Sequence, residues 1–214
     1  PHVTRDFAKG GRPAFAEHLE AARAQAAEAD FAIGAAAMFV GGPRNREITL
    51  APAERAPLAK LIAESGIRAV AHSTYTAPPW RGDPSAAKFV RAEQEVCAEA
   101  GVRSLVVHLP DFPVARVLRY APRIVTDRGV KIFLETPAIR RYNTPELLAG
   151  LMGALEESID PTRSLFGVCV DTAHLWTSGV DLGSAEGAEQ WIRRLEASGI
   201  PDENIMIHLN DSKN

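Results

Sequence analysis

The chain has 214 residues, of which 46% are hydrophobic and 24% charged, and its formal net charge at pH 7 is −3. This composition is typical of a globular protein with one substantial core. The net charge argues against nucleic-acid binding through a broad basic surface but leaves room for local basic clusters. The sequence holds no apolar run long enough to cross a bilayer, so we expect no membrane association. Two cysteines, Cys97 and Cys169, are too few for a disulfide framework. They favour a reducing, intracellular setting, in the cytoplasm or the nucleus.

Short apolar runs along the chain predict strands. In chain order these runs cover residues 31–42, 67–73, 102–108, 130–135, 166–171 and 204–208. They are continuously apolar rather than alternating, which indicates burial on both faces of a parallel sheet. The sequence therefore predicts strands that are covered by helices on at least one side.

Proline and glycine signals delimit helices between these strands. The expected helices cover residues 51–65, 83–100, about 113–127, 144 onward and 184–198. Pro84 follows Asp83 at a helix start, and Gly66 and Gly101 stand where left-handed residues end helices. Strict alternation of strands and helices predicts right-handed βαβ units.

The expected fold class is α/β, and a (β/α)8 TIM barrel is the leading architecture, with a doubly wound open sheet as the alternative. We expect residues 1–214 to form a single TIM-barrel domain that is incomplete in this chain. Residues 1–3 begin where a first strand should be finishing, and no eighth strand follows the run at 204–208. A closed barrel collects side chains from many strands at one centre, whereas an open sheet binds ligands between two strands.

Histidines and carboxylates recur where the predicted strands end, about 30 residues apart, which is the size of one βαβ unit. They are His72, His108, Glu135, Asp171, His174 and His208. Any one of them alone is more often a hydrogen-bonded polar residue than a ligand, but their equivalent positions predict a shared metal or catalytic cluster. Imidazole and carboxylate suit zinc, manganese or iron better than magnesium alone.

Several motifs together resemble the endonuclease IV family of zinc-dependent apurinic/apyrimidinic (AP) endonucleases, which are TIM barrels. They are HLNDSK at 208–213, VDTAH at 170–174, HSTY at 72–75, VVHLP around His108 and LETPA around Glu135. The opening PHVT and the FVGGPR segment are similar to the family's loops after its first two strands. The resemblance covers essentially the whole chain, and HLNDSK together with Asp-Thr-x-His is its most specific part.

The resemblance implies two zinc ions that share a ligand. His72, His108 and Glu135 would hold the first zinc. Glu135 would bridge to the second zinc, which Asp171 and His208 would also bind. The family adds a glutamate from its eighth strand to this second site, and no equivalent occurs in this chain.

The resemblance also implies a third zinc, with His174 as a ligand. The family completes this site with an Asp-x-His pair after HLNDSK, which the chain does not contain. Up to three zinc ions are therefore implied, with manganese as an alternative metal. The residues implied in catalysis are Glu135, Asp171 and His174.

The implied substrate is double-stranded DNA that contains abasic sites, and the implied reaction is hydrolysis of the phosphodiester 5′ to the lesion in base excision repair. Tyr75 and Arg44 match the positions whose side chains, in enzymes of this family, enter the DNA base stack at the lesion. An aromatic wedge and an arginine suit an enzyme that must turn a nucleotide out of the duplex. The family resemblance also implies a monomer.

Two other functions remain open from the residues. A sugar isomerase or epimerase of the xylose-isomerase-like barrels shares the strand-end Glu, the Asp-x-x-His and a later His, and uses one or two divalent ions. A catalytically impaired descendant that serves as a structural or interaction module would explain the missing ligands. The extra pair His72 and His108, with HLNDSK, favours the nuclease.

Overall fold

The computed structural model describes residues 14–76, 78–159 and 164–211. The chain divides into two compact units. Unit 1 comprises residues 1–77, 88–105 and 126–130, and unit 2 comprises residues 78–87, 106–125 and 131–214. The first strand expected at residues 1–3 lies outside the described residues.

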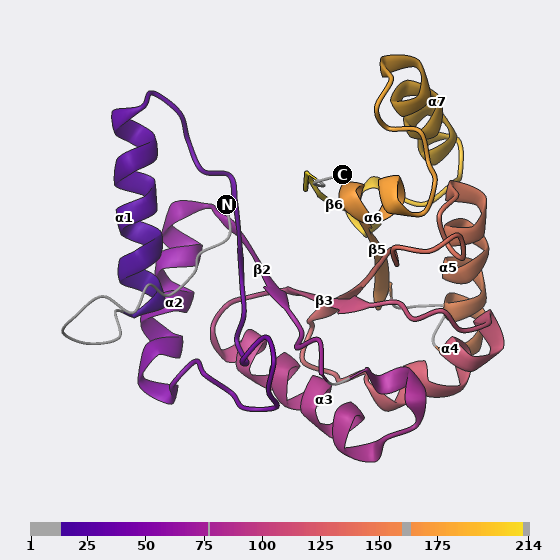
Figure 1. Ribbon diagram of the computed structural model, residues 1–214. Coiled ribbons are helices and arrows are strands. Elements are labelled where there is room, and N and C mark those ends of the chain that lie inside the picture. The colour runs from indigo at the N-terminus through magenta and orange to yellow at the C-terminus, as the bar shows by residue number, and fades with distance from the viewer. Residues whose placement is uncertain (1–13, 77, 160–163, 212–214) are drawn as a thin grey trace. The chain divides into compact units, whose positions relative to one another are not determined.

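Unit 1 contains a parallel pair of strands, β1 (Ala35–Met38) and β2 (Arg68–His72). Helices α1 (Phe15–Glu28) and α2 (Pro52–Ser65) pack against each other in this unit (Figure 1). Helix α2 begins with a proline at its first position and ends at Gly66, whose φ of 68° is the left-handed conformation expected there.

Helix α3 (Pro84–Glu99) and strand β3 (Ser104–His108) contribute residues to both units. Unit 2 continues with two parallel pairs, formed by β4 (Lys131–Glu135), β5 (Phe166–Asp171) and β6 (Ile205–His208). In both units the strand order follows the order of the chain, as consecutive βαβ units require.

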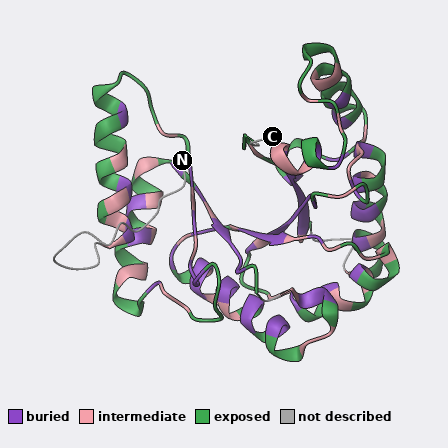
Figure 2. Cartoon of the chain, in the orientation of Figure 1, coloured by how far each residue is buried: buried purple, intermediate pink, exposed green. Residues whose placement is uncertain are grey.

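The helices of unit 2 cover the strands and complete the core. They are α4 (Val114–Tyr120), α5 (Pro145–Ile159), α6 (Thr172–Thr177) and α7 (Ala185–Glu196), with short 3-10 turns at Pro79–Arg81, Ala121–Arg123 and Asp202–Asn204. Helices α5 and α7 contact each other, and Arg194 near the end of α7 pairs with Glu146 near the start of α5 at 2.6 Å. Figure 2 shows one buried and one exposed face on the long helices.

Strands β4 and β5 are buried almost throughout, as their continuous apolar runs predicted, and β3 is buried along its middle. Strands β1 and β2 are buried only in part, and none of the residues of β6 is buried, which differs from the prediction. Every residue of β5 is buried, and Leu134, Leu151 and Val168 are fully enclosed in the core of unit 2. Burial of this kind, at about 25 cal/mol per Å² of apolar surface, is the main contribution to folding. None of the described helices is both long enough and apolar enough to span a membrane.

Three predicted elements differ from the structure. The strand expected at 31–42 forms only as Ala35–Met38. The helix expected at about 113–127 ends at Tyr120, because Pro122 lacks the N–H that would continue it and also restricts the residue before it. The turn expected between Asp171 and His174 is the first part of helix α6.

Candidate metal centre

Four of the predicted ligands are the last residues of successive strands. His108 ends β3, Glu135 ends β4, Asp171 ends β5 and His208 ends β6. Asp171 and His208 are register partners in the parallel pair β5–β6. The backbone N–H of Leu109 donates to the carbonyl oxygen of Glu135 over 3.0 Å, which places the end of β3 beside the end of β4. The carboxyl ends of these strands therefore meet at one edge.

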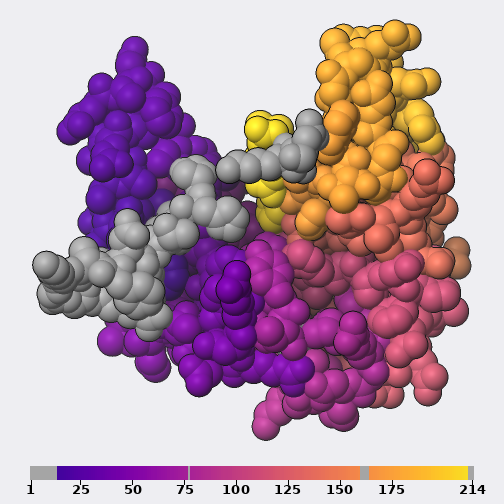
Figure 3. Space-filling view, in the orientation of Figure 1, coloured from indigo at the N-terminus to yellow at the C-terminus, as the bar shows by residue number. Residues whose placement is uncertain are grey.

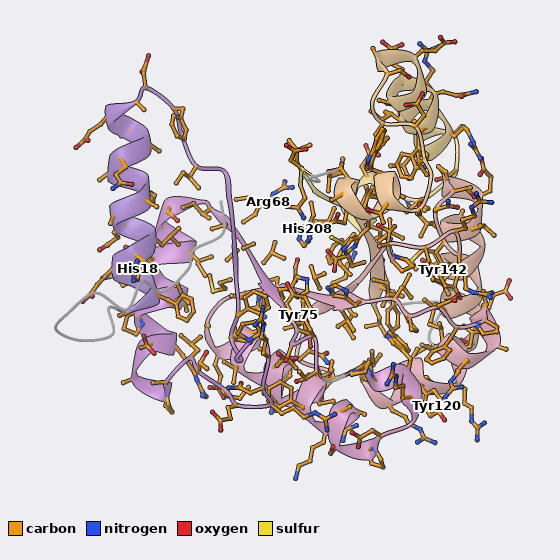
Figure 4. The ribbon with its side chains drawn as sticks, viewed as in Figure 1. His18, Arg68, Tyr75, Tyr120, Tyr142 and His208 are labelled. Atoms are coloured by element: carbon orange, nitrogen blue, oxygen red, sulfur yellow. The ribbon has the colours of Figure 1, made fainter. Side chains whose placement is uncertain are left out.

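The carboxylate of Glu135 contacts an imidazole with each of its oxygens. Oε2 lies 2.6 Å from Nε2 of His108, and Oε1 lies 2.9 Å from Nδ1 of His208, whose side chain is labelled in Figure 4. Glu135 is 2% exposed. One buried carboxylate thus holds together two imidazoles from different strands, which is the arrangement expected of a carboxylate that bridges two metal ions.

Asp171 uses both of its carboxylate oxygens as acceptors. Oδ1 accepts from the backbone N–H of His174 at 2.8 Å, so Asp171 is the N-cap of helix α6. Oδ2 accepts from Nδ2 of Asn210 at 2.5 Å. The backbone N–H of Asp171 donates to Oγ1 of Thr136 over 3.0 Å. The side chain is therefore fixed at the sheet edge from three sides.

His174 is oriented by a carbonyl group. Its Nδ1 lies 2.8 Å from the carbonyl oxygen of Thr136, and its ring centroid lies 5.7 Å from that of His108. A carbonyl oxygen only accepts hydrogen bonds, so the ring proton is on Nδ1 and the lone pair is on Nε2. This tautomer is the one that binds a metal through Nε2.

The donor set fits a metal ion. Ligand atoms of Glu135, Asp171 and His174 lie within 4.8 Å of one another, and both carboxylates are 2% exposed. Two buried carboxylates this close are costly unless cations compensate them. Burial, Glu135 and Asp171 together raise the pKa of the neighbouring Cys169 thiol well above its usual value. The donors that the described residues bring together here are imidazole nitrogens and carboxylate oxygens, which suit zinc, manganese or iron.

The other predicted site residues lie in unit 1. His72 ends β2, and its Nδ1 lies 2.8 Å from the carbonyl oxygen of Ser73. Tyr75 is 53% exposed, and its ring contacts those of His72 and Phe39 at centroid distances of 5.3 and 5.8 Å (Figure 4). Arg44 is exposed on the segment after β1. Membership of His72 in the same metal cluster as the unit 2 ligands stays a prediction, as do the roles of Tyr75 and Arg44.

Three residues support the candidate centre without having been predicted to do so. Thr136 contacts both Asp171 and His174, through its hydroxyl and its carbonyl oxygen respectively. The indole of Trp80, which is fully buried, donates from Nε1 to the carbonyl oxygen of His108 over 2.7 Å. Nε of Arg116 in α4 in turn donates to the carbonyl oxygen of Trp80 over 3.0 Å. The position of Thr136 directly after Glu135 in LETPA was the available signal.

An apolar hollow of about 630 Å³ lies beside the centre in unit 2. It is lined mainly by α6, α7 and the end of β6, with Trp176, Trp191 and Leu209 among the lining side chains. In Figure 3 the yellow atoms of the β6 end lie next to the orange atoms of these helices. None of the candidate ligands lines this hollow, so we separate it from the metal centre.

Comparison with known proteins agrees with the architecture and with the motifs. A probable AP endonuclease of African swine fever virus (isolate Tick/South Africa/Pretoriuskop Pr4/1996) is 34% identical over 189 residues, which are 85% of this chain and 63% of the viral protein. The chain thus spans less than two thirds of the length of this curated relative. A probable endonuclease 4 of Cenarchaeum symbiosum (strain A) is 30% identical over 129 residues, covering 56% of this chain and 45% of that protein.

Solved structures show the same likeness. The crystal structure of AsfvAP:AG superposes with a TM-score of 0.90 at 30% identity, over 100% of this chain and 74% of that one. The expected resemblance to the endonuclease IV family is confirmed, and so is the expected barrel class. Residues 23–214 match the model of one family, described as xylose isomerase-like TIM barrel. The chain belongs to that family of xylose isomerase-like TIM barrels.

Proposed function

We propose that the protein is a zinc-dependent AP endonuclease that hydrolyses the phosphodiester 5′ to abasic sites in double-stranded DNA, in base excision repair. The observation that carries the proposal is the Glu135 carboxylate, which meets His108 with one oxygen and His208 with the other at the ends of neighbouring strands. The names of the relatives support a nuclease rather than a sugar isomerase.

We assign the metal ligands from this geometry and from the motifs. His72, His108 and Glu135 would hold one zinc ion, and Glu135, Asp171 and His208 would hold a second. His174 would be a ligand of a third. When bound, zinc ions supply Lewis-acid stabilisation of phosphoryl charge and activation of water. Manganese would suit the same donors.

The chain's own residues would keep these groups in place. Asn210 donates to Oδ2 of Asp171, and the backbone N–H of His174 donates to Oδ1. These two contacts set the orientation of the carboxylate. Thr136 fixes the tautomer of His174. Such contacts orient ligands, and their loss typically weakens metal binding 10- to 100-fold. Glu135, Asp171 and His174 are the proposed catalytic residues, because each would contact an ion that binds the reacting phosphate.

Tyr75 and Arg44 are proposed to contact DNA. Both are exposed, and the Tyr75 ring rests on Phe39, which gives it a firm base for stacking on a nucleotide. Aromatic side chains that stack on bases contribute about 1–3 kcal/mol each. We propose a monomer inside the cell. The two cysteines, which are free and buried, fit that reducing setting.

The proposal is tested by incision of a duplex that carries one abasic site, measured with added zinc, with added manganese and after treatment with a chelator. We expect incision on the 5′ side of the lesion, loss of activity with the chelator and recovery with zinc. Turnover of a sugar without incision would instead assign the alternative isomerase. Stoichiometric metal analysis shows whether the wild-type protein binds zinc at all, and an absence of metal and of incision would refute the proposal.

A further inference from the structure

A buried glutamate lies outside the candidate metal centre. Glu93 stands in the middle of α3 and has no exposed surface. It belongs to unit 1 and none of the metal-ligand groups includes it. Burial raises the pKa of its carboxyl group to about 7, although hydrogen bonds from Ser73 and Thr74 act in the opposite direction. A carboxyl group in this position costs stability, so its presence requires an explanation.

Glu93 contacts the two residues that follow β2. Oε2 accepts from Oγ of Ser73 at 2.5 Å, and Oε1 accepts from the backbone N–H of Thr74 at 3.3 Å. Ser73 and Thr74 are the only residues between His72 and Tyr75. The carboxylate therefore holds the short link between a proposed metal ligand and a proposed DNA contact.

The same carboxylate lies beneath the segment that follows β1. A Cβ atom added at Gly41 would lie 3.2 Å from Oε1 of Glu93 and 3.0 Å from the ring of Phe89. Glycine at this position allows the backbone of residue 41 to approach Glu93 and Phe89 closely. Gly41 forms an antiparallel bridge with Ile48, so the two ends of the loop formed by residues 41–48 are paired with each other.

Hydrogen bonds join the two segments to each other. Oγ1 of Thr74 and the backbone N–H of Tyr75 both donate to the carbonyl oxygen of Pro43, at 3.1 and 3.0 Å. Nε and Nη2 of Arg46 donate to the carbonyl oxygen of Thr76, at 3.3 and 3.0 Å. Hydrogen bonds thus connect residues 41–48 to residues 73–76. The buried carboxyl group of Glu93 contacts both segments.

We propose that Glu93 is a positioning residue that holds residues 73–76, and through them the Tyr75 ring, in the conformation that binds abasic DNA. The inference rests on the proposed function, which it extends to a residue that no motif contains. Glu93 does not touch the substrate. It acts through Ser73 and Thr74, whose positions decide where the Tyr75 ring stands above Phe39.

A positioning role predicts a loss of function in protein that is still folded. Glu93→Leu removes both hydrogen bonds and leaves the buried N–H of Thr74 without this acceptor, which costs stability. Glu93→Gln keeps an acceptor for Thr74 and a donor for Ser73. If Glu93 served only to stabilise the fold, the folded leucine variant would bind and incise DNA as the wild type does.

The test compares the full chain with Glu93→Leu, Glu93→Gln and Ser73→Ala at pH 8. Glu95→Gln is the matched control, because Glu95 is on the same helix and its exposed pair with Arg128 contributes little. For Glu93→Leu we expect amide hydrogen exchange in residues 73–76 to be about tenfold faster and the KM for an abasic duplex to be about tenfold higher. Both quantities are measured at a temperature where every variant is folded, as its melting curve shows, and Ser73→Ala should show the same changes at smaller size.

The outcomes separate this inference from the proposed function. Hydrogen exchange in residues 73–76 does not depend on any activity, so it tests the positioning role even if the wild-type protein fails to incise DNA. The inference would be overturned if Glu93→Leu and Ser73→Ala had the same exchange rates in residues 73–76 and the same KM as Glu95→Gln. A rise in KM that disappears once both variants are assayed well below their melting temperatures would also overturn it, because a loss of fold stability alone would then explain the effect.

Discussion

Asp171 caps the helix that carries His174: its Oδ1 accepts the backbone N–H of His174 at 2.8 Å. The Asp-x-x-His spacing is therefore the spacing of an N-cap residue and the third residue of a helix, as well as that of two proposed metal ligands. The cap brings the histidine back toward the sheet edge, where its Nδ1 meets the carbonyl oxygen of Thr136.

The double role of Asp171 can be separated by substitution. In Asp171→Asn the cap is kept, because asparagine caps helices as well as aspartate, but the charged ligand is lost. We expect nearly unchanged stability with a large loss of bound zinc. Asp171→Ala should lose the cap as well, at a cost of about 1 kcal/mol. Thermal unfolding in the presence of a chelator and zinc analysis measure the two effects independently, and equal zinc content in Asp171→Asn and wild type would contradict the assignment.

Glu135 should determine how much bound zinc stabilises the folded protein. A ligand that binds only the folded state at 100 times its Kd stabilises that state by about 2.7 kcal/mol. We expect zinc to raise the melting temperature of the wild-type protein and a chelator to reverse the change. In Glu135→Gln the bridging charge between His108 and His208 is gone, so zinc should have little effect. Calorimetry with and without zinc checks this, with Glu146→Gln on the surface of α5 as the control.

Substitution of Thr136 tests the contacts that orient the proposed ligands, and it leaves the ligand residues themselves unchanged. Thr136→Val keeps the carbonyl group that His174 contacts but removes the hydroxyl that accepts from the backbone N–H of Asp171. A buried N–H left without a partner costs about 1–3 kcal/mol. We expect the free energy of unfolding in urea to fall by that amount and zinc affinity to fall with it, whereas Thr136→Ser should restore both. Unchanged stability in the valine variant would show that the hydroxyl has no such role.

The carboxyl group of Glu93 predicts a pH dependence of stability. Its pKa is about 7 in the folded protein, against an ordinary value of 4.5. Between these values the folded state keeps a proton that the unfolded state has lost, so stability falls as pH rises from 4.5 to 7. The shift corresponds to roughly 3 kcal/mol over that range. We expect Glu93→Gln to remove this slope from the unfolding free energy measured at several pH values; two parallel profiles would contradict the prediction.

The sequence predicted the strand ends and the polar side chains at them because that information is local. A continuous apolar run that stops at a histidine or carboxylate shows where a buried strand leaves the core, and parallel strands place those ends together. His108, Glu135, Asp171 and His208 were found in this way, and the structure brings the carboxylate of Glu135 between the two histidines.

The contacts that orient the ligands could not be found in the same way. The carbonyl oxygen that receives His174 belongs to the backbone of Thr136, and any residue type has a carbonyl group. Helix α6 spans only Thr172–Thr177, which is too short for a periodic pattern. Glu93 did leave a signal, since it lies between Val90 and Cys97 on the buried face of its helix, where a charged side chain conflicts with the apolar pattern.

The indole of Trp80 has a use that follows from its bond to the carbonyl oxygen of His108. The emission of a buried indole depends on the electric field of the groups that it contacts. Any ion that draws the His108 backbone toward the sheet edge would alter that field, while Trp176 and Trp191 line the separate apolar hollow. We therefore expect ion binding at His108 to change the emission of Trp80, and a Trp80→Phe variant would separate that change from the emission of Trp176 and Trp191.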